Sequence, residues 1–237
     1  MKETSTKFLS VLKYSIKKIL FKRRIVVAVL SLIFIVAVMG YATTQDVAEI
    51  ELGTELMNLL ILSFLVPVIT MIYGSSVVRD EIEDKSITHI IMAPLDRSLS
   101  YLGYYLAIIT CLISMLLIIT TAGFLSFFLP LGISSASIDV YIKMMTLVSL
   151  GTLVYSALFV FVSLLTSKAI YFGLFYAFIW EGFVGLLPGR IQKIAINHYL
   201  KSIGSQWIEK ITLNNATSSS LLLYLLLVLN STFVLLG

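Results

Sequence analysis

Six apolar stretches, each long enough to cross a bilayer, constrain the fold of this chain more than any other feature. They lie near residues 25–42, 56–78, 101–129, 143–166, 169–187 and 219–237. An apolar stretch of about 20 residues spans the hydrocarbon core as an α-helix, because a helix satisfies its backbone polar groups within one segment. We therefore predict an all-α integral membrane protein with six transmembrane helices in one domain, residues 1–237.

Composition supports this fold class. The chain is 59% hydrophobic and 13% charged, and its mean hydropathy is +1.00. Soluble domains carry about 25% charged residues, so a solvated surface is excluded for most of this chain. Eight of the seventeen basic residues fall within the first 24 positions, beside the first apolar stretch. This placement favours contact with a membrane surface and predicts no nucleic-acid partner.

The distribution of charge predicts the orientation. With the N-terminus inside, residues 1–24, 79–100 and the turn at Lys168 hold twelve of the seventeen Lys and Arg. The first outer loop holds Asp46 and three glutamates without a basic residue. The positive-inside rule then predicts a multi-pass protein of the cell membrane with a cytoplasmic N-terminus. The sequon at Asn215 fits an outer loop at 188–218.

The N-terminal segment is predicted to form a helix at the membrane surface. Its apolar residues recur on one helical face, and Lys7, Lys18 and Lys22 lie opposite. The apolar positions are Leu9, Leu12, Ile16, Ile19 and Leu20. Such a helix lies flat at the inner interface. It either orients the first span or acts mechanically beside a partner.

Enzyme motifs are absent from the sequence. No GxxxxGK[ST] phosphate-binding loop occurs, so any use of ATP must belong to another chain. The HExxH pattern is also missing, and His89 and His198 are predicted on opposite sides of the membrane, solvated or interfacial. The single Cys111 lies in an apolar stretch. We expect neither an enzyme nor a bound cofactor.

Glu181 is the only carboxylate well within a predicted span. It lies three residues past Phe178, near the middle of the fifth span, and hence about 4 to 5 Å from mid-membrane. A charge there costs about 2.5 kcal/mol or more on the insertion scale, which favours protonation, a polar partner or a water-filled cavity. Glu181 is therefore either a gate or pathway residue or a hydrogen-bonding residue that fixes helix packing.

Hydroxyl side chains share one face of the fourth span. Ser149, Thr152 and Ser156 recur at steps of three and four residues, with Thr146 and Ser163 on the same face. Small hydroxyl residues are common where membrane helices pack closely, so we favour helix packing over a role in lining a pathway. In the second span, Pro67 is predicted to kink the helix.

A charged, proline-broken segment, "EIEDKSITHIIMAPLDR", separates the second and third spans. Ile87, Ile90 and Ile91 stand at i, i+3 and i+4, so a short helix would present an apolar stripe outside the membrane. That stripe would contact either a cytosolic protein or lipid headgroups.

This segment resembles a motif of the type-2 ABC exporter permeases, in which charged residues precede a pair of aliphatics and a Pro-x-x-Arg. The matching positions are Glu81, Glu83, Asp84, Ser86, Ile87, Ile90, Ile91, Pro94, Leu95 and Arg97. The stretch "YAFIWEGFVGLLPGRIQKIAINHYL" is also similar to the end of the fifth span in a subgroup of that family. Lys85 stands where the pattern has Gly, and Tyr104 where a Lys often follows Gly103.

The resemblance implies a coupling helix that contacts a cytosolic ABC ATP-binding subunit. It also implies a second permease chain, identical or different, with ATP and Mg²⁺ bound by the partner subunits. The chain would then be a transport subunit that exports a substrate its sequence does not identify. Two alternatives stay open: a permease-like scaffold that anchors a cytosolic protein without transport, and an intramembrane enzyme that uses Glu181.

Overall fold

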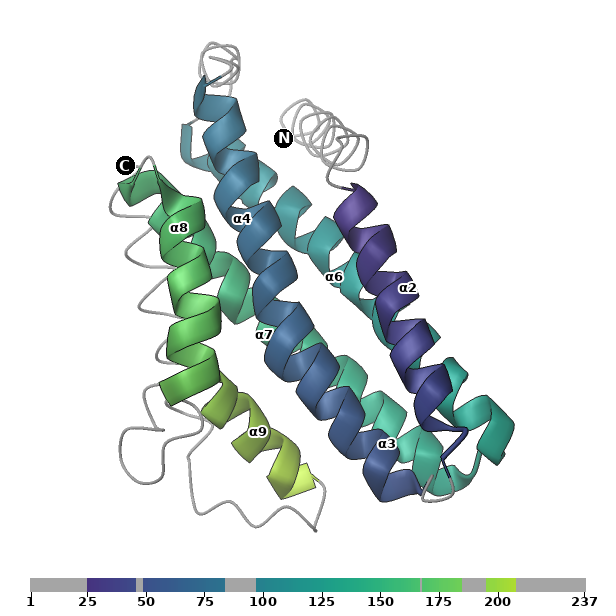
Figure 1. The fold of residues 1–237 in the computed structure, drawn as a ribbon. Helices are drawn as coiled ribbons and strands as arrows, with labels where there is room; N and C mark the ends of the chain where they lie inside the picture. The colour runs from purple at the N-terminus through teal and green to yellow at the C-terminus, as the bar shows by residue number, and fades with distance from the viewer. Residues whose placement is uncertain (1–24, 46–48, 84–96, 167, 185–194, 208–237) are drawn as a thin grey trace.

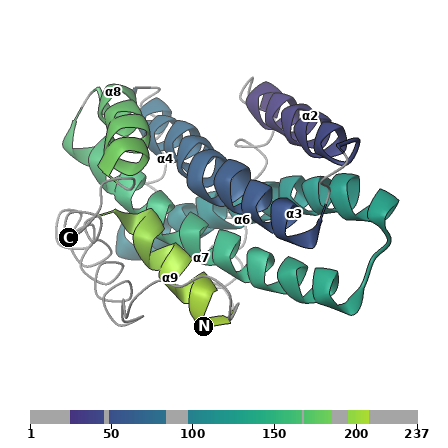
Figure 2. The same ribbon diagram turned by 60° about the horizontal axis from the view of Figure 1, so that its bottom comes forward.

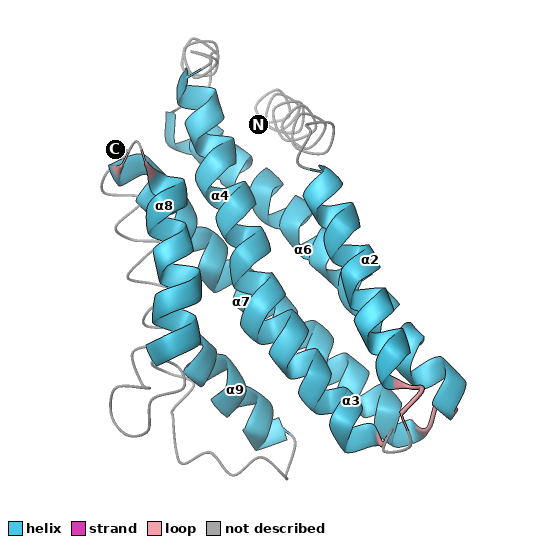
Figure 3. Cartoon of the chain, viewed as in Figure 1, coloured by secondary structure: helices cyan, strands magenta, loops and turns pink. Residues whose placement is uncertain are grey.

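The chain folds as a bundle of helices (Figures 1 and 3). A computed structural model describes residues 25–45, 49–83, 97–166, 168–184 and 195–207, and within these ranges it contains no strand. The elements are α2 (Ile25–Ala42), α3 (Ile50–Met57), η1 (Asn58–Leu65), α4 (Val66–Glu83), α6 (Arg97–Leu131), α7 (Ser135–Leu165), α8 (Ala169–Leu174), η2 (Phe175–Val184) and α9 (Ile196–Trp207). The predicted all-α class is confirmed for this part of the chain.

Four helices are long and apolar enough to cross a membrane. They are Ile25–Ala42, Ile50–Ser75, Tyr105–Leu131 and Ser135–Leu165. The fifth predicted span is helical through α8 and η2, and among the described residues its apolar part is Ala169–Ile179. The predicted sixth span (219–237), the N-terminal helix and the coupling helix lie outside the described residues.

Two helices begin earlier than the sequence indicates. The second membrane helix begins at Ile50 rather than near residue 56, and the fourth begins at Ser135 rather than near 143. Ser134 caps the fourth helix, since its Oγ accepts a hydrogen bond from the Ser137 N–H at 3.2 Å. Residues 50–55 and 135–142 fall outside the predicted spans and carry charged side chains. In α7 the charge of Lys143 pairs with that of Asp139 one turn before it on the same helix.

The helix around Pro67 contains a π-helical segment. Proline lacks an N–H and its ring crowds the carbonyl four residues earlier, so it disturbs a regular α-helix. Here η1 comes directly before α4, in which Pro67 is the second residue. Ser63 Oγ donates to the Asn58 carbonyl, five residues back, at 3.0 Å. The chain thus runs as one helical path from α3 through η1 into α4.

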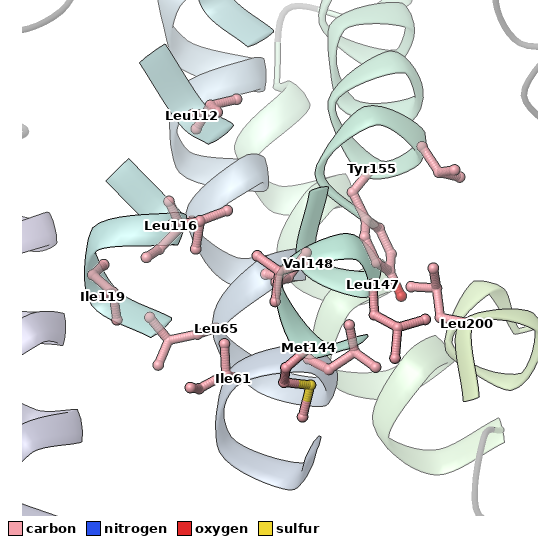
Figure 4. Close-up of a cluster of buried hydrophobic side chains, with 14 of the residues drawn as sticks. Ile61, Leu65, Leu112, Leu116, Ile119, Met144, Leu147, Val148, Tyr155 and Leu200 are labelled. Carbon is pink, nitrogen blue, oxygen red and sulfur yellow. The ribbon is translucent and has the colours of Figure 1, made fainter. Parts of the chain in front are cut away.

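The helices form two layers. α4 lies between α8 and α2 in one layer, while α7 and α6 form the other, with α9 beside α7 (Figures 1 and 2). α7 packs against α4, α6, α8 and α9, whereas α2 packs chiefly against α6. The buried core between the layers joins η1, α6, α7 and α9 (Figure 4). Its labelled members are Ile61, Leu65, Leu112, Leu116, Ile119, Met144, Leu147, Val148, Tyr155 and Leu200.

Small residues set the closest helix crossings. A Cβ at Gly123 of α6 would lie 2.7 Å from Ile35 Cγ2 of α2. One turn along this crossing, Ser126 Oγ donates a hydrogen bond of 2.9 Å to the Val36 carbonyl. Within a membrane, no hydrophobic effect drives helices together, so their association depends on van der Waals packing. Small residues let two helices approach closely enough to gain that packing. The α2–α6 contact therefore depends on Gly123 and Ser126.

Candidate functional site

The charged segment joins two long helices at one end of the bundle. α4 ends at Glu83 and α6 begins at Arg97, and both ends lie at the same end as the start of α2 (Figure 1). The backbone of Glu81 and Glu83 forms the last turn of α4. Asp84, Ser86, Ile87, Ile90, Ile91 and Pro94 lie outside the described residues. The predicted coupling residues thus begin and end on rigid helices that pack against one another.

The starts of α2 and α3 lie at opposite ends of the bundle (Figure 1). In sequence, α2 follows the basic residues Lys22–Arg24, and its start lies at the end where α4 stops. Glu49 precedes α3 and Glu55 lies within it, and both are exposed. We call the end where α2 begins the basic end, after the sequence Lys22–Arg24, and the end where α3 begins the acidic end.

The hydroxyl groups on α7 are bonded to their own helix. Thr152 and Ser156 are buried and donate to the carbonyls of Val148 at 2.6 Å and Leu153 at 3.0 Å. Ser149 is half-buried and donates to the Met145 carbonyl at 2.8 Å. Such bonds to a preceding carbonyl satisfy a hydroxyl in an apolar setting. As donors, these groups are occupied, and Ser149 is the most accessible of the three.

Two substitutions distinguish a hydroxyl that joins helices from one that does not. Ser126→Ala removes the bond between α6 and α2, and interhelical bonds in membranes contribute about 0.6 kcal/mol on average. Thr152→Val removes only a side-chain bond within α7, and the acceptor, the Val148 carbonyl, remains part of the same helix. We expect Ser126→Ala to lower the free energy of unfolding in mixed micelles and Thr152→Val to leave it unchanged. Equal losses would contradict this assignment.

α9 packs beside the middle of α7. A Cβ at Gly151, near the midpoint of α7, would lie 3.1 Å from Leu200 Cδ1 and 3.3 Å from Val66 Cγ1. α9 lies within residues 188–218, the predicted outer loop, where apolar residues such as Tyr199 and Leu200 recur at helical spacing. Of the two predicted settings for His198, solvated or interfacial, the first is wrong, since only 8% of His198 is exposed. Its ring packs edge-on against Tyr199, with centroids 5.6 Å apart.

Sequence reasoning missed this buried polar region because no local pattern marks it. Asn197 and His198 lie in the first turn of α9, and polar residues at the start of a helix commonly cap one that is exposed. Their burial follows from the contact of α9 with α7. The one available signal was Gly151, whose lack of a side chain permits close approach by another helix.

Glu181 lies within the π-helical segment η2. η2 contacts η1, where the rings of Phe178 and Phe64 meet edge-on with centroids 5.9 Å apart. π-helical turns are rare in proteins as a whole, but those that occur are often found at functional sites. The backbone of Glu181 thus belongs to one of two contacting π-helical segments: η1 continues directly into α4, and η2 contacts α4.

No metal-binding cluster occurs among the residues that the structure describes: no three His, Cys, Asp or Glu side chains converge there. Cys111 is buried in α6. Neither a scan against protein-family models nor a search of curated protein sequences finds a match to this chain.

Proposed function

We propose that the chain is the membrane-spanning permease subunit of an ATP-binding cassette exporter of the type-2 class. The observation that carries the proposal is the segment of residues 84–96, which resembles a coupling helix and connects α4 to α6. In support, both helices meet this segment at the basic end of the bundle. ATP and Mg²⁺ would be bound by a separate cytosolic subunit, and this chain would reside in the cell membrane with its N-terminus in the cytoplasm.

Helix packing suggests how motion would be transmitted. Closure of the ATP-binding subunits would push on residues 84–96 and displace the adjoining ends of α4 and α6. α4 is packed against α7 and α8, so a displaced α4 carries these helices with it. A tilt of these helices would change access to a path between two permease chains. Ser149, Thr152, Ser156 and Glu181 are the candidates for that path.

The second permease chain would contact the layer formed by α2, α4 and α8. α2 has a wide exposed apolar face that includes Val29, Leu30 and Ile33. α8 exposes Tyr171 and Phe172. The two faces flank α4, so a two-fold partner could place its α8 against this α2 and the reverse (Figure 2).

Reconstitution tests the proposal. The chain would be coexpressed with an ATP-binding subunit, purified as a complex and placed in sealed vesicles. We expect ATP-dependent movement of a solute that also stimulates ATP hydrolysis. A complex that forms but neither transports nor responds to any solute would support the scaffold alternative. A chain that never associates with an ATP-binding subunit would exclude the transport function.

Glu181→Gln is expected to lower ATP-dependent transport without lowering the amount of inserted protein. The amide keeps the size and hydrogen-bonding capacity of the side chain but cannot carry a charge or exchange a proton. Transport rate and thermal stability would be measured on the same preparation. If stability falls and transport per folded complex is unchanged, Glu181 is a packing residue. Loss of a product-forming activity without any ATP-binding partner would instead indicate an intramembrane enzyme.

A further inference from the structure

The turn between α6 and α7 bears an exposed apolar surface. We call Leu129–Ile138 the hairpin tip. Leu129 is 65% exposed, Leu131 44%, Ile133 46% and Ile138 47%. The left-handed backbone of Gly132, with φ of 87°, makes the tight reversal. Four large exposed apolar side chains on one short hairpin indicate that lipid or a protein partner shields them from water.

The contact of α6 with α2 gives the depth of this tip. α2 has 18 residues, about 27 Å, which matches a hydrocarbon core of about 30 Å. A Cβ at Gly40, in the last turn of α2, would lie 3.0 Å from Ser126 Oγ. Ser126 is thus level with the outer end of α2. α6 continues for five more residues to Leu131, a further distance of about 7.5 Å along its axis. The tip therefore extends past the end of α2.

At the same end of the bundle as the hairpin tip, the start of α3 carries acidic side chains. A Cβ at Gly53 of α3 would collide with the ring of Phe127, so these two residues are level. Four residues outward from Gly53 is the exposed Glu49, and four residues outward from Phe127 is Leu131. Positions at comparable height are therefore acidic on α3 and apolar on the hairpin.

The apolar surface of the tip continues the lateral surface of the bundle. Ile118, Leu125 and Leu129 are all exposed on α6, and their spacing places them within about 40° of one another around its axis. On α7, Ile138 and Ile142 continue the exposed surface one turn apart. The charges of Asp139 and Lys143 pair with each other. An apolar stripe that runs along a membrane helix and ends on an apolar tip without net charge suits a lipid interface.

We propose that the hairpin tip is a membrane-surface anchor, which enters the headgroup and upper acyl region of the leaflet at the acidic end of the bundle. The bundle then leans toward the hairpin side, so that the start of α3 faces water while Leu131 and Ile133 contact lipid. This proposal is independent of the proposed transport function.

Fluorescence quenching in vesicles tests the anchor. An environment-sensitive fluorophore would be attached to Ile133→Cys, with Glu49→Cys as the aqueous control and Ile118→Cys as the control within the acyl region. Wild-type protein serves as the labelling blank, since Cys111 is buried. The vesicles would contain phosphatidylcholine and phosphatidylglycerol, with or without a phospholipid carrying a nitroxide high on its acyl chain.

We expect the nitroxide lipid to quench the Ile133 label several-fold more strongly than the Glu49 label. Quenching of both Ile133 and Ile118 labels would show that the tip and the spans share the bilayer. If the Ile133 label responds to the nitroxide no more than the Glu49 label does, the anchor is refuted and the tip belongs to water or to a protein partner. Leu131→Cys provides a second position, and flotation of each labelled variant with the vesicles confirms that it is membrane-bound.

Discussion

Replacing Ile90 and Ile91 with Asp is expected to abolish copurification of an ATP-binding subunit while leaving insertion of the chain intact. Both residues belong to the apolar stripe predicted for the segment between α4 and α6. Apolar anchors at an interface contribute about 2 kcal/mol or more each, so losing two would weaken binding about a thousandfold. A carboxylate buried against the partner adds a desolvation cost. Copurification at equal expression levels provides the measurement.

The matched control places the same two charges beside the stripe. Thr88 and His89 lie between Ile87 and Ile90 in sequence. A helix would place His89 on the face opposite the isoleucines and Thr88 beside their stripe, about 60° from Ile91. Thr88→Asp with His89→Asp therefore adds equal charge without removing the apolar contact. We expect this variant to retain the partner. A complex that survives the Ile90 and Ile91 changes with full transport-coupled ATP hydrolysis would show that the coupling contact lies elsewhere.

The sequence predicts a helix boundary well where polarity changes abruptly. The predicted end of the first span, residue 42, is the last residue of α2, and two threonines follow it. The start of α7 was missed because Asp139 and Lys143 resemble a loop when counted singly. As a pair one helical turn apart they neutralise each other, and Ser134 provides the cap.

Tertiary contacts explain what sequence patterns could not predict in the candidate site. The hydroxyl periodicity of α7 is real, but only the structure shows that Thr152 and Ser156 donate to their own helix. Burial of His198 depends on α9 lying against α7 at Gly151, residues far apart in sequence. A local sequence pattern does not predict a contact between helices that are far apart in the chain. The exposed hairpin tip lies almost wholly in residues 130–142, between the predicted third and fourth spans, where the sequence predicted no element.

These contacts indicate which helices can move together. α4 and α7 pack against each other along the bundle, and α8 contacts both. α2 contacts chiefly α6, and only Ala28, Ile35 and Met39 are buried along its 18 residues. A displacement at residues 84–96 would therefore reach α7 and α8 through α4, and α2 through α6. The α2–α6 crossing decides whether α2 follows α6.

Gly123→Leu is accordingly expected to detach α2 from the bundle. A Cβ at Gly123 would already lie 2.7 Å from Ile35 Cγ2, closer than carbon atoms approach in proteins. Ile35 is β-branched and nearly fixed in χ1 within a helix, so it cannot rotate aside. Overpacking costs about 1 to 3 kcal/mol, and a full Leu side chain should reach the upper part of that range. The free energy of unfolding in mixed micelles would show the loss.

Two further variants identify the α2–α6 crossing as the cause. At Gly173 of α8 an added Cβ would meet Met71, an unbranched side chain that can adopt other rotamers. Gly173→Ala should therefore cost less than Gly123→Ala, although both add one methyl group inside the bundle. In the Gly123→Leu background, Ile35→Ala removes the obstructing methyl group and should restore part of the lost stability, a coupling that residues out of contact would not show. If the effects of the two substitutions on the free energy of unfolding are additive, Gly123 and Ile35 are not in contact.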